Sequence, residues 1–510
     1  MRYASDMLHS ETSPGESVAE LKALVEMLRT ENKLLHQKVR LLLKRLFGSK
    51  SEALNPAQLQ LLMAGLEVGE LSAPDEDDPP PSSPSPGGSK KRRGSKPRIP
   101  ENLPTEDVRL DPEEVKAAPL AYKRIGEEVT REIDVIPPQY FCRRIIRGKY
   151  VKLDDKAASP IIAPLPERLI EGSYASAGIV TDIVIKKYQD HLPLYRQEQI
   201  LEDRYGIEIS RQTMAEWVRA AADWLSPVYR LIRKRLQESK YLQVDETPVT
   251  YCNKDGPGGS AEGYFWVYHD PWKKDVLYEW HTGRGSKCLD DVLKDFKGTV
   301  QCDGYGAYTS YARGNDGIDI ACCWAHARRK FNEALDEAPR LSGWFIAQIA
   351  GIYAVEARLR RMKAGPALRE AVRAAESRMI LDRIGKALKV HLPKHLPQSQ
   401  MGKAVSYTLS RMKELTKFCD NGLLEIDNNG VENSIRPTAV GKKNWLFIGH
   451  PEAGDRSAVL YTIIENCKRR GINPQEYLKD VLTRLPSMKM GQVDSLLPAS
   501  WLAERAKKIA

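Results

Sequence analysis

The nine residues Tyr241-Leu-Gln-Val-Asp-Glu-Thr-Pro-Val249 place two acidic side chains directly after a short apolar run. The run from Tyr241 to Val244 predicts a buried strand that delivers Asp245 and Glu246 at its end. Pro248 is expected to stop regular sheet pairing soon afterwards. An acid at the end of a buried strand is costly unless it is solvated, paired or bound to a metal. This stretch therefore predicts a functional acid.

The same pattern occurs again in Thr299-Val-Gln-Cys-Asp-Gly304, where a short strand is expected to end in Asp303. Further on, Glu432 lies on a predicted helix within Glu425-Ile-Asp-Asn-Asn-Gly-Val-Glu-Asn-Ser-Ile-Arg-Pro437. Hard divalent cations prefer carboxylate oxygens, and two such ions can hold the attacking and leaving oxygens of a phosphodiester. Asp245, Asp303 and Glu432 are therefore the predicted metal ligands and catalytic acids.

Two other acids lie beside these three in the sequence and are interpreted differently. Glu246 is expected on the opposite face of the strand from Asp245, because successive side chains of a strand alternate. Asp427 or Asn429 is interpreted as a cap of the helix that carries Glu432.

Composition sets the class of protein. The chain has 510 residues, of which 42% are hydrophobic and 29% charged, which is typical of a soluble globular protein with several domains. Its net charge of +10 suits a polyanionic partner. The sequence shows no signal-like start and no apolar run of membrane-spanning length, so no membrane partner is expected. The eight cysteines form no CxxC pair, which favours reduced thiols and a cytoplasmic location.

Residues 18–47 carry a strict heptad repeat that predicts a coiled-coil dimerisation helix. One polar residue, Asn32, interrupts the apolar seam and is of the kind that fixes register in a parallel pair. The alternative is an amphipathic helix packed on its own domain. The seam consists of Leu21, Val25, Leu28, Asn32, Leu35, Val39, Leu42 and Leu46.

Two segments of different character follow. Residues 72–100 are rich in proline, serine and charge, which predicts a disordered linker. Its basic run Lys90–Arg93 is interpreted either as a contact to DNA phosphates or as a solvated spacer. Residues 101–170 alternate short β-like runs, Val129–Ile136 and Tyr140–Ile146, with prolines, and predict a small β-rich module.

Residues 171–238 predict a helical, helix-turn-helix-like DNA-binding region. A helix at Leu194–Tyr205, a stop at Gly206, an N-cap at Ser210 and a second helix at Arg211–Trp224 give this pattern. The residues placed to read base edges are Arg211, Gln212 and Thr213. An ordinary helical hairpin remains the alternative.

Residues 239–338 have a mixed α/β pattern. A hairpin is expected at Tyr264–His269 and Val276–Trp280, a helix at Lys287–Phe296, and a last strand at Ile318–Trp324. Three antiparallel strands, a helix and a further strand match the ribonuclease H arrangement, in which the first and fourth strands are neighbours. The sequence then predicts a helical insertion at 339–420, the last part of the core at 421–485 and an extended tail at 486–510.

Four separate blocks resemble one known family. They are Val244-Asp-Glu-Thr-Pro248, Val300-Gln-Cys-Asp-Gly-Tyr-Gly306, Cys323-Trp-Ala-His-Ala-Arg-Arg-Lys-Phe331, and Ile426-Asp-Asn-Asn-Gly-Val-Glu-Asn433 with Lys442-Lys-Asn444. In this order they resemble bacterial insertion-sequence transposases of the DDE class, and most closely the TnpC-type large subunit of the insertion-sequence-66 family. The similarity runs from about residue 120 to 485.

The resemblance implies a multidomain α/β protein with a ribonuclease H-like catalytic core interrupted by an all-helical insertion. It implies cleavage and joining of double-stranded DNA with Mg²⁺ or Mn²⁺, and it places the catalytic acids at Asp245, Asp303 and Glu432. Pairing of two element ends implies a homodimer or a higher oligomer on DNA. Family members often come with small accessory proteins.

The chain departs from the family pattern in one respect. Family members usually carry CxxC pairs of a zinc-binding module, whereas the matching stretch 117–155 holds only Cys142. A tetrahedral zinc site needs four ligands, so no zinc is expected. Cys323 and His326 have the spacing of metal ligands but lack a second pair. We interpret Cys323 as a core residue and His326 as a residue that approaches the active site.

Several cationic residues are candidates for contacts to DNA. Arg436 is interpreted as a phosphate clamp or as an ion pair with Glu432. Lys442 and Lys443 before Trp445 predict a backbone contact with a stacked base, or else a solvated turn before a core tryptophan. Arg328 and Arg329 are the remaining candidates for contacts to DNA, whereas His326 and Asn433 are further candidate site residues without an assigned DNA contact.

These observations predict a transposase. Two alternatives use the same residues: a dimeric DNA-binding regulator with an idle core, and a structure-specific nuclease on the same fold.

Overall fold

The computed structural model describes residues 25–28, 119–121, 139–150, 161–253 and 259–509. Residues 25–28 are helical, as the coiled-coil prediction requires. The rest of the 18–47 segment and the whole 72–100 linker lie outside the described residues, so both stay predictions. The chain divides into two compact units, of which one spans Lys50–Ile162.

In that unit, the described residues form a 3-10 turn, η1 (Pro119–Ala121), and an antiparallel pair of short strands, β1 (Lys149–Tyr150) and β2 (Ile161–Ile162). The prediction of a strand at Tyr140–Ile146 is wrong, because this run has no strand pairing and most of its side chains are exposed. The other β-like run, at 129–136, lies outside the described residues.

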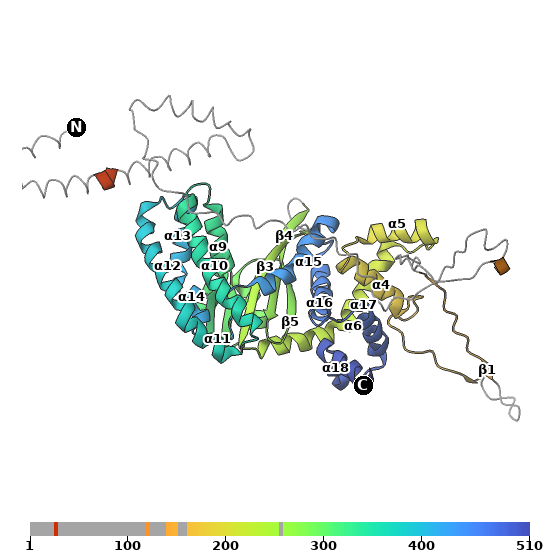
Figure 1. The fold of residues 1–510 in the computed structure, drawn as a ribbon. Helices are drawn as coiled ribbons and strands as arrows, with labels where there is room; N and C mark the ends of the chain where they lie inside the picture. The colour runs from red at the N-terminus through yellow and green to blue at the C-terminus, as the bar shows by residue number, and fades with distance from the viewer. Residues whose placement is uncertain (1–24, 29–118, 122–138, 151–160, 254–258, 510) are drawn as a thin grey trace, which may run out of the picture. The chain divides into compact units, whose positions relative to one another are not determined.

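The second unit contains a five-stranded sheet with the order β5-β4-β3-β6-β7 (Figure 1). Strand β3 pairs antiparallel with β4 and parallel with β6, and β6 pairs parallel with β7. The first and fourth strands of the unit are therefore neighbours, as predicted. The strands are β3 (Tyr241–Cys252), β4 (Ser260–Asp270), β5 (Asp275–His281), β6 (Gly298–Cys302) and β7 (Ile318–Cys322).

The expected end of pairing at Pro248 is wrong, because β3 continues to Cys252 and stays paired with β4 throughout. On its other side, β3 pairs with β6 only over Tyr241–Gln243. Pro248 therefore lies where the strand has one neighbour, a position at which a missing N–H is tolerated. Beyond it, Ile448 bridges to Tyr251 and extends the pairing on the open side.

Short helices connect the strands of the second half of the sheet. The helix predicted at 287–296 is shorter, with η2 (Ser286–Leu289) leading into α7 (Asp290–Leu293). Helix α8 (Gly306–Arg313) follows the loop that carries Asp303. The predicted last strand ends two residues early, because Cys323 is the N-cap of α9 (Trp324–Glu333).

The predicted helix, glycine turn and capped helix are confirmed in α5 (Leu194–Tyr205) and α6 (Arg211–Gln237), which follow α4 (Ala177–Tyr188). Gly206 has a φ of 62° and ends α5, and the Ser210 side chain accepts a hydrogen bond from the Thr213 N–H. Helix α6 runs well past the predicted end at Trp224, and Pro227 lies inside it. Apolar residues continue at helical spacing beyond that proline and are buried against β5 and α16 (Pro451–Lys468).

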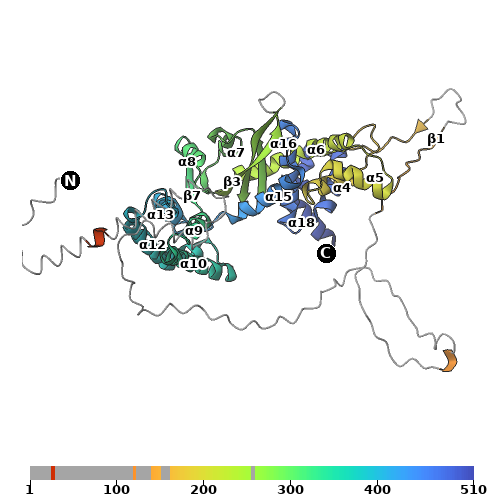
Figure 2. The same cartoon turned by 90° about the horizontal axis from the view of Figure 1, so that it is seen from above.

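The segment predicted as a helical insertion is helical throughout and packs with α9 beside β7 (Figure 2). Its apolar core includes the fully buried Phe331, Phe345, Leu381 and Leu415 and is continuous with Ala321 of β7. A single π-helical turn, η3 (Arg373–Ser377), brings Arg373 into this core. The other elements are α10 (Pro339–Arg361), α11 (Pro366–Val372), α12 (Arg378–His391), η4 (Leu392–Lys394), α13 (Gln400–Ser410), α14 (Met412–Thr416) and η5 (Lys417–Cys419).

The chain ends in a further set of helices. They are α15 (Asn429–Trp445), α16 (Pro451–Lys468), α17 (Pro474–Arg484), η6 (Leu485–Ser487), η7 (Met490–Leu496) and α18 (Pro498–Ile509). The expected extended tail at 486–510 is wrong, because the Trp501 side chain is only 4% exposed and its indole donates to Asp480 Oδ2 at 2.8 Å. No helix in the described ranges combines the length and apolarity needed to cross a membrane.

Candidate active site

The sheet register places the first two predicted acids side by side. Gln243 of β3 lies opposite Gln301 of β6, and both strands run in the same direction. Two residues further along each chain are Asp245 and Asp303. Adjacent strands are about 4.8 Å apart, so the two acids lie at the same level of neighbouring chain segments. The prediction that the sheet brings them together is supported by this register.

The surroundings of the Asp245 carboxyl group disfavour its ionised form. Burial raises its pKa well above the ordinary value, and the charges of Glu246, Asp303 and Glu432 raise it further. The Glu246 N–H donates to Asp245 Oδ1 at 2.9 Å and opposes this shift. Asp303 and Glu432 therefore both lie within electrostatic reach of Asp245.

The loop that carries Asp303 is held by residues of the helical segment. The Tyr407 hydroxyl donates to the Asp303 carbonyl oxygen at 2.6 Å, and Arg411 Nη2 donates to the Gly304 carbonyl oxygen at 2.9 Å. Gly304 has a φ of 87°, and a Cβ there would lie 2.3 Å from Arg411 Nε. These contacts are not predictable from the sequence, because the partners are about a hundred residues apart.

The Glu246 side chain pairs with residues other than the predicted acids, which is consistent with its interpretation as an acid outside the catalytic set. Its Oε1 accepts from Arg284 Nε at 2.8 Å, its Oε2 accepts from the Tyr308 hydroxyl, and its side chain is only 1% exposed. A carboxylate with two such partners has little capacity left for a cation.

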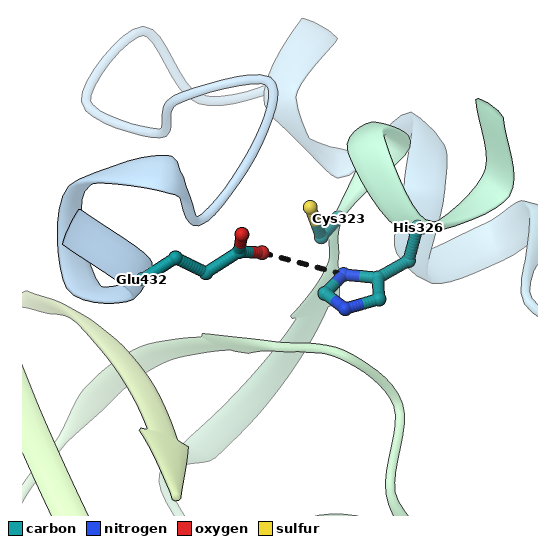
Figure 3. Close-up of side chains that lie close together, drawn as sticks. All are labelled: Cys323, His326 and Glu432. Atoms are coloured by element: carbon teal, nitrogen blue, oxygen red, sulfur yellow. Dashed lines mark ion pairs between the residues drawn. The ribbon is translucent and has the colours of Figure 1, made fainter. Parts of the chain in front are cut away.

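Glu432 lies in the first turn of α15, where the sequence predicted a helix. Figure 3 shows its carboxylate pointing toward His326, with Oε1 3.7 Å from His326 Nδ1 and the Cys323 sulfur close by. The ligand atoms of Cys323, His326 and Glu432 all lie within 4.8 Å of one another. Within the described ranges, the three predicted acids do not form a group that tight.

A buried polar network fixes the segment that leads into α15. Gln243 Nε2 donates to the Asp427 carbonyl oxygen and Gln301 Nε2 to the Glu425 carbonyl oxygen, both at 2.8 Å. These two glutamines precede Asp245 and Asp303 by two residues each. The strands that carry the aspartates therefore also position the segment that carries Glu432. Sequence analysis missed this network, because glutamine in a buried strand carries no recognisable spacing.

The network continues under the first turn of α15. Arg469 Nη2 donates to the Gly430 carbonyl oxygen at 2.6 Å, and Arg469 Nη1 contacts His269 Nε2 at 2.9 Å. Burial and the Arg469 charge lower the pKa of His269 well below its ordinary value, so its imidazole is neutral. Its Nε2 then accepts from Arg469, and its Nδ1 donates to Gln243 Oε1 at 3.1 Å.

Models of known protein families match two successive parts of this region of the chain. A family model described as "Transposase IS66 family" matches residues 172–456, and one described as "IS66 C-terminal element" matches residues 462–499. The chain belongs to the IS66 transposase family. The family assignment predicted from the four sequence blocks is thus confirmed.

The relatives of the chain extend over nearly its whole length. "Uncharacterized protein y4jD" of Sinorhizobium fredii (strain NBRC 101917 / NGR234) is 30% identical over 97% of this chain and 98% of the relative. "Uncharacterized protein y4qI" of the same organism is 29% identical over 96% of this chain and 90% of the relative. Both comparisons include the five-stranded sheet and the helices around it.

A third family model, described as "Transposase C of IS166 homeodomain", matches residues 34–108. Homeodomains are DNA-binding modules, so this match indicates a DNA-binding region ahead of the sheet. It overlaps the end of the predicted coiled coil and the predicted linker, and all of its residues lie outside the described part of the chain.

The candidate DNA-contacting residues of this family member differ in exposure. Arg211, Gln212, Arg328, Asn433 and Arg436 are exposed, and Thr213 is partly exposed. Arg329 is also exposed but forms an ion pair with Glu333 at 3.1 Å. Arg436 makes no ion pair with Glu432 in the described part of the chain, where the partner of Glu432 is His326.

The end of α15 presents a different aromatic residue from the one predicted. Lys443 is exposed, whereas Lys442 donates to the Pro248 carbonyl oxygen at 2.9 Å. Trp445 is half-buried, but Phe447 is 50% exposed and follows Leu446, which has a φ of 67°. A non-glycine residue in the left-handed region is often a sign of a functional site.

We expect Phe447→Ala to lower the affinity for single-stranded DNA about tenfold, because an exposed ring contributes roughly 1–3 kcal/mol per stacked base. Fluorescence anisotropy with a labelled oligonucleotide measures this change. Val440→Ala, which removes an exposed aliphatic side chain from α15, the helix that ends just before Phe447, is the matched control and should bind normally. Equal affinity of Phe447→Ala and the unmodified protein would exclude the contact.

We expect Gly430→Ala to slow strand cleavage by roughly a hundredfold, because an angstrom-scale misplacement of a catalytic group has an effect of that order. A Cβ at this position would lie 2.4 Å from Gln243 Oε1 and 2.8 Å from His269 Nδ1, which forces the start of α15 to move. Single-turnover cleavage rates measure the effect. Gly449→Ala, where nothing lies within 4 Å of the added carbon, should cleave at the normal rate. A normal rate for Gly430→Ala would show that the position of this turn does not limit catalysis.

Proposed function

We propose that the protein is a DDE transposase that cuts and joins DNA strands at the ends of a mobile element by two-metal-ion chemistry. The observation that carries the proposal is the parallel pairing of Gln243 with Gln301, two residues before Asp245 and Asp303, together with the hydrogen bonds from both glutamines to the segment that leads to Glu432. The strand order, with its central parallel pair, supports a ribonuclease H-like core interrupted by a helical insertion.

The residues fit a pair of hard divalent cations. Asp245 and Asp303 offer carboxylate oxygens, the donors that Mg²⁺ and Mn²⁺ prefer. Burial, and after it the charges of neighbouring acids, raises the pKa of Asp245, and a bound cation would offset both effects by stabilising the ionised carboxylate. Glu432 completes the set when its side chain turns from His326 toward the aspartates. When bound there, Mg²⁺ or Mn²⁺ supplies Lewis acidity to the attacking and leaving oxygens.

The protein's own residues orient the reaction. The Asp303 backbone is fixed by Tyr407 and the first turn of α15 by Arg469, so the backbone segments that carry these two acids are positioned before DNA arrives. Helices α9 and α15 meet where His326 lies opposite Glu432. Arg328 on α9 and Arg436 on α15 are exposed, and we propose that they contact phosphates. No side chain of the protein is required as a nucleophile, because water and then a DNA 3′-hydroxyl attack phosphorus.

The partners follow from this activity. Double-stranded DNA is the substrate, at the element ends and at the target. Two ends must be held together, so the active form is a homodimer or a higher oligomer on DNA, with the 18–47 segment as its dimerisation helix. Accessory proteins of the same element act with it, in the cytoplasm where its DNA substrate is found.

Incubation with labelled element-end DNA and Mg²⁺ or Mn²⁺ tests the proposal. Cleavage followed by joining of the freed 3′ end to a second DNA is the expected result. Binding without cleavage at any metal concentration would identify a regulator with an idle core instead. Cleavage without joining would identify a nuclease.

A further inference from the structure

One side-chain group does not fit the chemistry of Mg²⁺. Cys323 caps the start of α9, His326 lies in its first turn, and Glu432 reaches across from α15 (Figure 3). Their ligand atoms, one sulfur, one nitrogen and one oxygen, all lie within 4.8 Å of one another. Two elements about a hundred residues apart in sequence thus bring together three different donors.

The group is polar, buried in part and incompletely satisfied. His326 Nδ1 is buried and has no hydrogen-bond partner among the described residues, and Glu432 Oε1 lies 3.7 Å from it. Beside it, the Asn428 N–H donates to Cys323 Sγ at 3.4 Å. The side-chain amide of Asn428 is buried, also without a partner in the described part of the chain. Buried polar atoms without partners need an explanation, and a bound ion is one.

The donor set selects the kind of ion. Sulfur and imidazole ligands favour Zn²⁺ and similar borderline-soft ions over Mg²⁺, which binds oxygen. Zinc lies about 2.3 Å from sulfur and about 2.0–2.1 Å from nitrogen, so ligands on one ion are roughly 3.5 Å apart. Separations within 4.8 Å therefore close onto an ion by small side-chain movements.

We propose that Cys323, His326 and Glu432 form a site for one exchangeable divalent ion of the zinc class. The fourth position of the ion is open, because the protein offers three ligands. On binding, the Cys323 thiol releases its proton to solvent and its sulfur bonds to the ion as a thiolate. Three ligands hold an ion less firmly than the four of a structural zinc centre, so chelator-treated protein is metal-free.

The site has a consequence for the proposed function, on which this part of the inference rests. Glu432 is shared between the zinc-class site and the proposed catalytic set. An ion bound to Cys323 and His326 keeps the Glu432 carboxylate away from Asp245 and Asp303. Zinc-class ions therefore inhibit the Mg²⁺-dependent reaction by occupying this site.

The described residues contain a second group with similar separations between ligand atoms, which is less suited to a zinc-class ion. It consists of Glu279, His281 and Asp291. Glu279 Oε1 is already 2.7 Å from Arg233 Nη2, and no sulfur is present. An ion at that group would give no sulfur signal, so spectroscopy separates the two groups.

Cobalt titration of the chelator-treated full-length protein tests binding without DNA. We expect one equivalent of Co²⁺ to produce a near-ultraviolet thiolate-to-cobalt band and visible bands of four-coordinate cobalt, both removed by one equivalent of Zn²⁺. Cys323→Ser, which keeps a hydrogen-bond acceptor for Asn428, should lose the thiolate band. His326→Gln should weaken cobalt binding at least about tenfold. Cys288→Ser, a partly buried thiol elsewhere, should leave the spectrum unchanged.

Absence of the thiolate band in the unmodified protein, or its full retention in Cys323→Ser, would overturn the site. Circular dichroism shows whether Cys323→Ser is folded, and His326→Gln tests the same site if it is not. Inhibition is tested separately, as the Zn²⁺ concentration that halves each variant's own Mg²⁺-dependent cleavage. We expect this concentration to rise about tenfold in Cys323→Ser, and an unchanged value would overturn the inhibition. A cobalt band without any DNA cleavage would retain the site and reject the transposase function.

Discussion

Replacing Asp245, Asp303 or Glu432 by its amide is expected to abolish Mg²⁺-dependent strand cleavage. Each change removes one charged ligand with little change of shape, so the cations are held weakly and the charge that balances them is lost. A loss of at least about a thousandfold in the single-turnover rate is expected, on the scale of removing a group that stabilises transition-state charge. Binding to element ends should survive, because contacts to phosphates and bases come from other residues.

Glu246→Gln is the control for this series. The amide oxygen can still accept from Arg284, and the amide nitrogen can donate to the Tyr308 hydroxyl oxygen once that hydroxyl rotates, so the local structure and most of the activity should be retained. Inactive Glu246→Gln together with normal cleavage by Glu432→Gln would show that the third acid is misassigned. Circular dichroism of each variant separates a catalytic loss from a folding loss.

The parts of the site that were predictable from sequence are those with a local pattern. Asp245 and Asp303 each follow an apolar run that is long enough for a strand, and the order of elements implies that these strands are neighbours. Glu432 follows a cap-like Asp-Asn-Asn segment that starts a helix. In each case, the residues that predict the strand or helix carrying the acid lie within about ten residues of it.

The parts that were not predictable depend on contacts between distant segments. Tyr407 and Arg411 contact the Asp303 loop because the helices from α10 to α13 pack beside it. Arg469, directly after α16, contacts Gly430. Pro248 was interpreted as a stop because its effect depends on whether a strand has one neighbour or two. The last helix was missed because the burial of Trp501 against α17 is a tertiary contact.

The positions of Cys323 and His326 also show the limit of spacing arguments. Cys323 and His326 have the spacing of metal ligands, but no second ligand pair accompanies them in the sequence. The third donor is Glu432, about a hundred residues later in the chain. A metal site that is completed by a catalytic acid has no local signature in the sequence.

Glu356→Gln is expected to lower the free energy of unfolding of the helical segment by roughly 3–5 kcal/mol, because it breaks a buried ion pair and leaves a charge unpaired. Glu356 and Arg373 are both fully buried, and Arg373 Nε and Nη2 each lie 2.7 Å from a carboxylate oxygen of Glu356. Arg369, which is also buried, lies 3.5 Å from the same carboxylate and would lose this neighbour as well. Urea unfolding followed by circular dichroism measures the change.

Glu376→Gln is the matched control, because Glu376 pairs with Arg358 in an exposed ion pair of the same helices. Pairs of that kind contribute about 0–1 kcal/mol, so this variant should unfold almost normally. We also expect Glu356→Gln to cleave DNA more slowly at temperatures where it remains folded. Arg373 Nη1 donates to the Phe418 carbonyl oxygen at 2.8 Å, and α13 in the same core carries Tyr407, which holds the Asp303 loop. A destabilised variant with an unchanged cleavage rate would show that the helical segment supports the fold without positioning the acid.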